Sequence, residues 1–146
     1  RDRRAPRGWR VSGMDFATLE EMVKGCPFHR LLGLELESFD LEAKTVTIAM
    51  PLKPEFSRSQ DKVELHGGIT AALIDIAGDY AVALVVGHGV PTIDLRVDYL
   101  KMGTGTRIAA TARAVRIGRT IGTVDIEVHD ETGTLFAIGR GKYSTA

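Results

Sequence analysis

The chain has 146 residues, of which 44% are hydrophobic and 26% are charged. These proportions are typical of one ordinary globular domain and exclude disordered and fibrous proteins. Lysine plus arginine and aspartate plus glutamate each total 19, so the formal net charge is zero. A strongly basic nucleic-acid binder is therefore excluded. The single cysteine, Cys26, cannot form an intrachain disulfide, which agrees with a reducing, cytoplasmic compartment.

Residues 1–13 differ from the rest of the chain because they hold five arginines and one acid. We expect this segment to be a flexible tail or an expression remnant. It does not read as a secretory signal, because no apolar segment follows the arginines. Residues 14–146 then form a single predicted domain.

A short helix is expected at the start of this domain. Asp15 or Thr18 can cap it, and Gly25 and Pro27 end it. After the helix, six segments alternate between apolar and polar residues, which is typical of strands with one buried and one solvent-exposed face. These segments are residues 34–39, 45–50, 92–99, 107–114, 123–129 and 135–144. Short links between the last four predict antiparallel hairpins in chain order, which is a meander.

The longest apolar stretch runs from Ile69 to Val86 and contains Asp75 and Asp79. Acids near the middle of a membrane span would cost about 2.5 kcal/mol or more each, so we predict a buried helix instead. A helix that is apolar nearly all round must be covered on every side. A sheet that wraps around it, or a second copy of the chain, would provide that cover. The element pattern is that of an α+β fold.

The strongest chemical signal lies at the start of this helix. Gly67 and Gly68 let a ligand approach the backbone closely, and the first amides of a helix favour negative charge. This is a suitable oxyanion hole for acyl transfer. Asp75 and Asp79 share a helix face, so one carboxyl is expected to bind its proton more tightly. In the alternative interpretation, both acids have a structural role: they line a solvated dimer interface and pair with arginines.

Several segments together resemble a known family. They are Pro27–Leu34, His66-Gly67-Gly68 followed by an acid nine residues after the histidine, Asp98–Lys101, Val115–Arg119, Val124–Val128 and the turn at 130–133. Over residues 26–144 the chain is similar to hotdog-fold acyl-CoA thioesterases of the phenylacetate-pathway and 4-hydroxybenzoyl-CoA type. The resemblance implies a hotdog fold, in which an antiparallel sheet wraps around one long central helix.

The resemblance also implies roles for individual residues. Asp75 is the catalytic carboxylate that attacks the thioester carbonyl or activates water. The Gly67 amide binds the oxyanion, Gln60 orients the carbonyl or the water, and His66 holds the turn or contacts the thioester. The family further implies a homodimer, or a tetramer built from two dimers. The acid and the glutamine of one site then come from different subunits.

Five residues are expected to contact the acyl-CoA substrate. They are Asp79, Gly68, Lys101, Arg116 and Arg119. Asp79 stands where the family usually has serine or threonine, so it alters the charge beside the catalytic acid. The three cations suit the phosphates of CoA, and Gly118 between the two arginines leaves backbone amides that can face a phosphate. As an alternative, the arginines are ordinary hairpin charges.

The sequence thus predicts hydrolysis of an aryl- or medium-chain acyl-CoA thioester. No metal or redox cofactor, nucleic acid or membrane partner is expected, and the four histidines lack metal-ligand spacing. One alternative is a hotdog hydratase or dehydratase, which would use a catalytic histidine paired with an acid. The other is a non-catalytic module that binds acyl-CoA or lipid. It would keep its function without Asp75, whereas a thioesterase would not.

Overall fold

The computed structural model describes residues 14–146, and the tail predicted for residues 1–13 lies outside them. Three α-helices, one short 3₁₀ helix and six strands make up the described part of the chain. They are α1 (Phe16–Gly25), α2 (Pro27–Leu32), β1 (Glu35–Asp40), β2 (Thr45–Pro51), η1 (Pro54–Phe56), α3 (Gly67–Val86), β3 (Thr92–Tyr99), β4 (Arg107–Ile117), β5 (Ile121–Asp130) and β6 (Leu135–Ser144).

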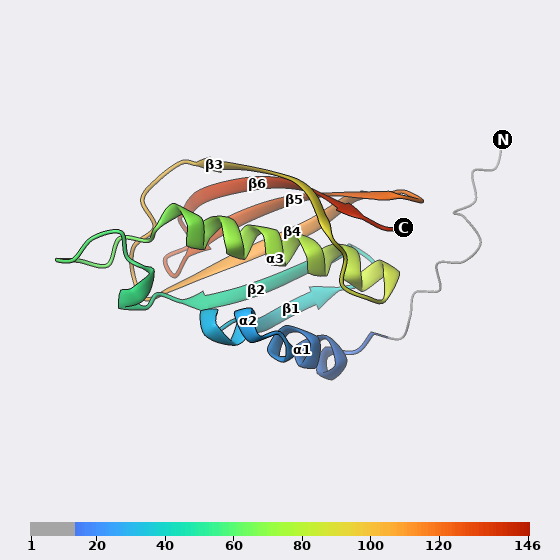
Figure 1. The fold of residues 1–146 in the computed structure, drawn as a ribbon, viewed down its shortest axis with the longest axis horizontal. Coiled ribbons are helices and arrows are strands. Elements are labelled where there is room, and N and C mark those ends of the chain that lie inside the picture. The colour runs from blue at the N-terminus through green and yellow to red at the C-terminus, as the bar shows by residue number, and fades with distance from the viewer. Residues whose placement is uncertain (1–13) are drawn as a thin grey trace.

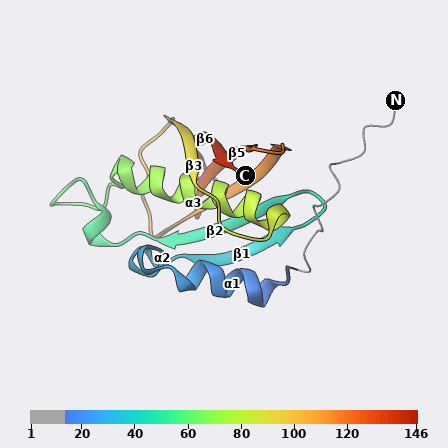
Figure 2. The same ribbon diagram turned by 45° about the vertical axis from the view of Figure 1, so that its right-hand side comes forward.

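The six strands form one antiparallel sheet in the order β1-β2-β4-β5-β6-β3. The sheet curls around α3, so that β1 and β3 lie on opposite sides of the helix (Figures 1 and 2). α1 packs against β1 and α2. The predicted arrangement, an antiparallel sheet wrapped around one long helix, is confirmed.

The first helix begins as predicted, but a second helix follows it that the sequence analysis missed. The Asp15 side chain caps α1 by accepting a hydrogen bond from the Thr18 amide at 2.8 Å. Pro27 does not end the helical region, because proline is well suited to the first position of α2. Gly33 ends α2 in the left-handed conformation at φ 73°. The first helix thus ends at Gly25 as predicted, and only the second helix was missed.

The predicted meander is wrong in one respect. β3 pairs with β6 and not with β4, which lies between β2 and β5. The inward side chains of β4 are fully buried, whereas every residue of β3 is exposed or half-buried. A buried strand needs neighbours on both sides, and a half-exposed one is suited to an edge. The link over residues 100–106 therefore crosses between the two halves of the sheet.

The long apolar helix is buried mainly by the sheet. By length and composition α3 would suit a membrane span, but 61% of its most apolar window is buried inside the fold. The sheet approaches closely because β4 presents alanines to the core at positions 110, 112 and 114. Asp75 and Asp79 lie on the half-exposed side of the helix.

Tyr143 fixes how α3 sits on the sheet. Its ring is fully buried, and its hydroxyl donates a hydrogen bond to the backbone carbonyl of Asp75 at 3.0 Å. The ring occupies a space between Gly78 of α3 and Gly141 of β6, where side-chain atoms would collide with it. The two glycines therefore let a β6 side chain reach the backbone of the central helix.

We predict that Gly78→Ala destabilises the protein by about 1–3 kcal/mol, because the added methyl group would overlap the Tyr143 hydroxyl. Urea unfolding checks this. Gly25→Ala is the matched control, since Gly25 also lies in a helix and a methyl group there meets nothing within 4 Å. That control should be neutral or stabilising, as alanine favours helix more than glycine does. Equal stability of Gly78→Ala and the wild type would contradict the close contact.

Candidate active site

The first turn of α3 leaves one backbone donor free. His66 caps the helix, and its Nδ1 atom accepts the amide hydrogen of Gly68 at 3.0 Å. Gly68, predicted to contact substrate, therefore does not offer its amide to a ligand in this geometry. The amide of Gly67 has no acceptor among residues 14–146. A helix N-terminus with one unused N–H group is suited to bind developing negative charge.

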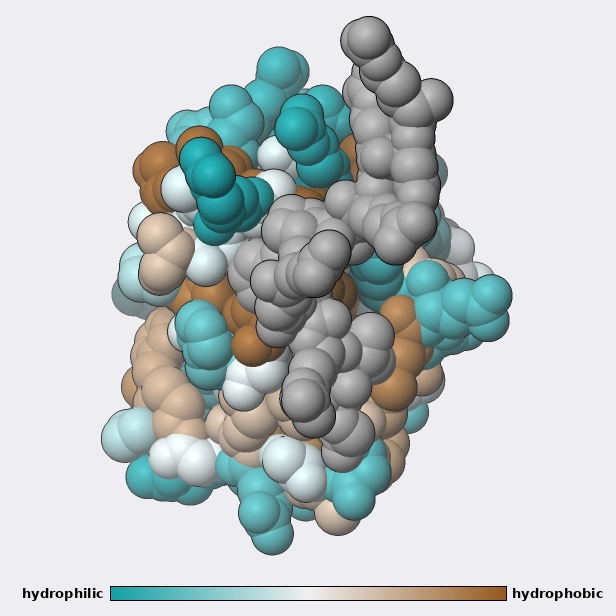
Figure 3. Space-filling view, turned by 90° about the vertical axis from the view of Figure 1, so that its right-hand side faces the viewer, coloured by the Kyte–Doolittle hydropathy of each residue, from teal (hydrophilic) through white to brown (hydrophobic). Residues whose placement is uncertain are grey.

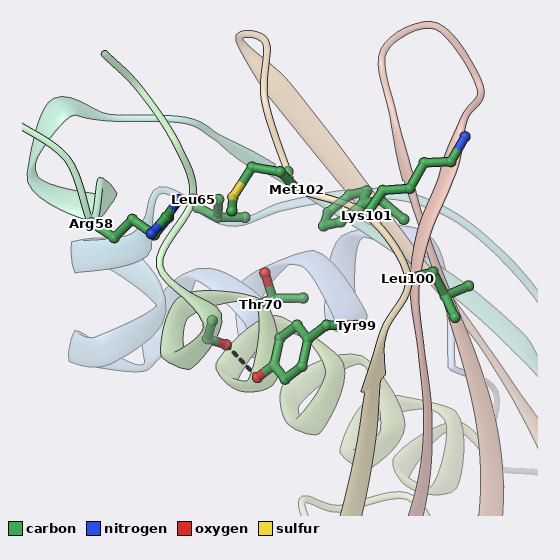
Figure 4. A pocket seen from close by; sticks show the side chains of 10 residues that line it. Arg58, Leu65, Thr70, Tyr99, Leu100, Lys101 and Met102 are labelled. Atoms are coloured by element: carbon green, nitrogen blue, oxygen red, sulfur yellow. Dashed lines mark hydrogen bonds between the residues drawn. The ribbon is translucent and has the colours of Figure 1, made fainter. Parts of the chain in front are cut away.

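Tyr99, at the end of β3, holds this turn in place. Its hydroxyl donates a 2.7 Å hydrogen bond to the Gly67 carbonyl (dashed line in Figure 4). A Cβ atom at position 67 would lie 3.2 Å from the Tyr99 ring, so glycine permits this approach. The contact fixes the carbonyl side of Gly67 while its amide stays free.

A cavity of about 500 Å³ opens beside the Gly67 turn (Figure 4). Its lining residues come from the loop before α3, from α3 itself, from the end of β3 and the loop that follows it, and from β6. They are Arg58, Leu65, Gly67, Thr70, Tyr99, Leu100, Lys101, Met102, Gly103 and Phe136. The cavity thus combines apolar walls with two cations. Gly67 and Lys101 both line this cavity, although the Lys101 ammonium extends away from the Gly67 turn in Figure 4.

Asp75 lies two turns farther along α3 and is held by the strand that follows. Its Oδ1 atom accepts a 2.7 Å hydrogen bond from the hydroxyl of Thr92, the first residue of β3. An irregularity in the β3–β6 pairing follows Thr92, where bulges commonly redirect a side chain. Sequence analysis missed Thr92, because nothing in the alternation of β3 distinguishes it from other polar residues.

Asp79 is the carboxyl of the pair that binds its proton more tightly. Burial raises its pKa from the ordinary value of 3.8 to about 6, and the neighbouring charge of Asp75 adds to the rise. The amide of Val90 donates to its Oδ1 atom at 2.9 Å and opposes the rise. Asp79 therefore anchors the connection between α3 and β3, a role that the sequence did not indicate.

The structure does not bring Asp75 and Gly67 of one chain to the same point. Eight residues of helix separate them by about 12 Å along the axis. Gln60 lies exposed on the loop that projects beyond the sheet at the left of Figure 1, and it does not line the cavity. Residues 14–146 of a single chain therefore cannot form a site that uses Gln60, Gly67 and Asp75 together.

Arg116 and Arg119 lie far from the cavity within one chain. They flank the β4–β5 turn, at the end of the sheet where α3 finishes (Figure 1). Figure 3 views the molecule from this end, where hydrophobic patches are interspersed with hydrophilic residues. The arginines and Lys101 therefore do not form one cationic site in a single chain. Within residues 14–146, no three His, Cys, Asp or Glu side chains gather to hold a metal ion.

Comparisons with known proteins agree on one family. The family model described as "Thioesterase superfamily" matches residues 64–137. The medium/long-chain acyl-CoA thioesterase YigI of Escherichia coli K12 is 31% identical over 142 residues, covering 85% of this chain and 88% of YigI. A solved Shewanella oneidensis protein related to the thioesterase superfamily is 32% identical. It has a TM-score of 0.76 and covers 89% of this chain and 94% of that one. A Pseudomonas aeruginosa thioesterase is 25% identical, with a TM-score of 0.79 and coverage of 93% and 96%.

We predict that Asp79→Asn raises the free energy of unfolding at about pH 7.5 by about 1–3 kcal/mol. The unfolded chain releases this proton near its ordinary pKa of 3.8 and the folded chain near 6. The wild type therefore loses stability as the pH rises between those values, and the asparagine variant does not. Its amide oxygen can still accept the Val90 amide.

Urea unfolding of both proteins at about pH 4 and about pH 7.5 measures the effect, which should vanish at the lower pH. Asp125→Asn serves as the control with the opposite expectation. The guanidinium of Arg140 lowers the pKa of Asp125, so neutralising that carboxyl should bring no gain in stability at neutral pH. A pH-independent effect of Asp79→Asn would show that burial of its charge is not the cause.

Proposed function

The chain belongs to the thioesterase superfamily, and we propose that this enzyme hydrolyses the thioester of an acyl-CoA to the free acid and CoA. The observation that carries the proposal is the free amide of Gly67, a residue that lines a cavity at the N-terminus of α3. An oxyanion that develops on the thioester carbonyl would accept this amide hydrogen. The helix dipole favours the same negative charge.

Asp75 supplies the carboxylate in this proposal. In one route it takes a proton from water while the water oxygen bonds to the carbonyl carbon. In the other route it attacks the carbonyl itself, and water then cleaves the mixed anhydride. In both routes the carbon–sulfur bond breaks and CoA leaves as a thiolate that acquires a proton. The Thr92 hydroxyl engages Oδ1, so Oδ2 is the oxygen left for the reaction.

We propose that two copies of the chain form each site. A carbonyl about 3 Å from the Gly67 amide is out of reach of Asp75 in the same chain, since about 12 Å of helix separates them. A second copy can bring its own Asp75 to the carbonyl. Gln60 precedes the Gly67 turn by only seven residues, so it is expected to act from the same copy as Gly67.

Exposed apolar side chains support an interface next to the cavity. Four large hydrophobic residues between positions 93 and 102 are about half exposed. They are Ile93, Tyr99, Leu100 and Met102. Exposed clusters of this kind commonly mark contacts with another chain. The same region includes the edge strand β3, so a second copy that covers it would lie beside the Gly67 turn.

The cavity favours a substrate with an apolar part and an anionic part. Leucine, methionine and phenylalanine side chains line its walls. Arg58, whose guanidinium also pairs with Glu64 at 2.7 Å, and Lys101 at the rim supply positive charge for phosphate groups. YigI, the Escherichia coli relative, is a thioesterase for medium- and long-chain acyl-CoA. We therefore place medium- and long-chain acyl-CoA first and aryl-CoA second among the substrates of this chain. We further propose that Arg116 and Arg119 contact CoA phosphates across the assembly.

We predict that the wild type releases free CoA thiol from at least one acyl-CoA and that Asp75→Asn lowers kcat by about 100-fold or more. A thiol reagent measures release over a panel of octanoyl-, palmitoyl-, benzoyl- and phenylacetyl-CoA. Asp61→Asn is the control, because Asp61 is an exposed acid on the loop before α3. Equal turnover by the Asp75 variant would sink the carboxylate mechanism. Absence of turnover on every thioester, with CoA still bound, would favour the binding-module alternative.

Subunit complementation tests the two-copy site. Asp75→Asn and Gln60→Ala should each be nearly inactive alone. When the two variants are co-expressed with different tags, random pairing makes about half of the dimers mixed, with one intact site of two in each. The mixture should therefore recover about a quarter of the wild-type rate. No recovery in purified mixed dimers would place Gln60 and Asp75 of one chain in the same site.

A further inference from the structure

The Thr70 hydroxyl is a buried polar group without a protein partner. Thr70 is only 2% exposed and lines the cavity beside Gly67. In Figure 4 its hydroxyl oxygen points away from α3, into the space near Leu65 and Met102. No atom of residues 14–146 makes a hydrogen bond with this hydroxyl. Buried polar groups are nearly always hydrogen-bonded, so this exception calls for a partner inside the cavity.

The usual helical explanation does not apply here. A threonine inside a helix often donates its hydroxyl to the carbonyl one turn earlier, which for Thr70 is that of His66. The His66 carbonyl instead accepts the amides of Ile69 at 3.0 Å and Thr70 at 3.4 Å. The hydroxyl of Thr70 thus stays available while its backbone is satisfied. Among the other neutral residues of the cavity, Tyr99 already donates its hydroxyl to Gly67.

Thr70 lies one turn beyond the Gly67 amide, about 4.5 Å along the helix axis. Both residues line the same cavity. Resting on the thioesterase activity proposed above, we propose that Thr70 is a further catalytic residue whose hydroxyl donates a hydrogen bond to the carbonyl oxygen of the bound thioester. The Gly67 amide and the Thr70 hydroxyl then form a two-donor oxyanion site.

The proposed contact changes no bond of Thr70 itself. As the water or carboxylate oxygen bonds to the carbonyl carbon, the carbonyl electron pair moves onto its oxygen, which the two donors stabilise. When the carbonyl re-forms, the carbon–sulfur bond breaks and the electron pair leaves with the CoA sulfur. The hydroxyl keeps its proton throughout. Donors placed for the developing charge lower the barrier more than they strengthen ground-state binding.

Thr70→Val tests the proposal, because valine has the same shape and no hydroxyl. We expect kcat to fall about 10- to 100-fold while KM changes less than about twofold. Thr70→Ser restores a hydroxyl and should recover most of the rate. The thermal midpoint of Thr70→Val should equal or exceed that of the wild type, because the lost hydroxyl has no protein partner. Rates are measured on the acyl-CoA that the wild type hydrolyses fastest.

Thr145→Val is the matched control. Thr145 is also buried, but its hydroxyl donates to the Gly118 carbonyl at 2.9 Å, at the opposite end of the sheet. This variant should lose thermal stability and keep its kcat. Thr70→Val should show the reverse pattern.

The outcomes separate this inference from the proposed function. If the wild type hydrolyses thioesters and Thr70→Val matches its kcat, the inference fails and the proposed function stands. A rise in KM with unchanged kcat would place the hydroxyl on a pantetheine amide and would also overturn the assignment to the reacting carbonyl. If the wild type hydrolyses no thioester, the proposed function fails first, and Thr70 loses its role with it.

Discussion

The position of the central helix depends on the contact between Tyr143 and the Asp75 carbonyl. A fully buried tyrosine reaches from β6 through a gap left by two glycines and hydrogen-bonds the helix backbone. Burial raises the pKa of this hydroxyl, so it remains a donor over the whole physiological range. Because α3 is rigid, fixing its middle also fixes its first turn. Gly67 is thereby placed against Tyr99, and Asp75 against Thr92.

The two carboxyl groups of α3 perform different tasks although they lie on one helix face. Asp79 accepts the Val90 amide and fixes the connection that leads into β3. That connection delivers Thr92, two residues later, to Asp75. The acid beside Asp75 is therefore a structural support, and its burial raises its pKa to about 6. The position of the Asp75 side chain thus depends on Thr92 directly and on Asp79 through the α3–β3 connection.

Most of the fold and part of the site could be predicted from the sequence. Alternating strands and one long apolar helix indicated the α+β class, because both patterns are local, and the family resemblance added the wrapped sheet. The pairing of β3 with β6 was not predictable in this way, since it depends on which strands have both edges buried. Gly67 and Asp75 became candidate site residues through the family resemblance of the segment that holds them. Thr70 and Thr92 were missed because their importance comes from a cavity and a bulge, which spacing along the chain does not reveal.

The pairing of β3 with β6 has a consequence for how the chain folds. Strand β3 is synthesised long before β6, and its first residue pairs with Tyr143, which lies 51 residues later. The pairing of the edge strand β3 and the hydrogen bond from Tyr143 to α3 therefore both depend on β6, which is synthesised last. Contacts between distant residues form slowly, because a long loop must close first. Docking of residues 135–144 would thus close the sheet and lock the helix in one step. Before that step, the nascent chain exposes an apolar helix that chaperones can bind.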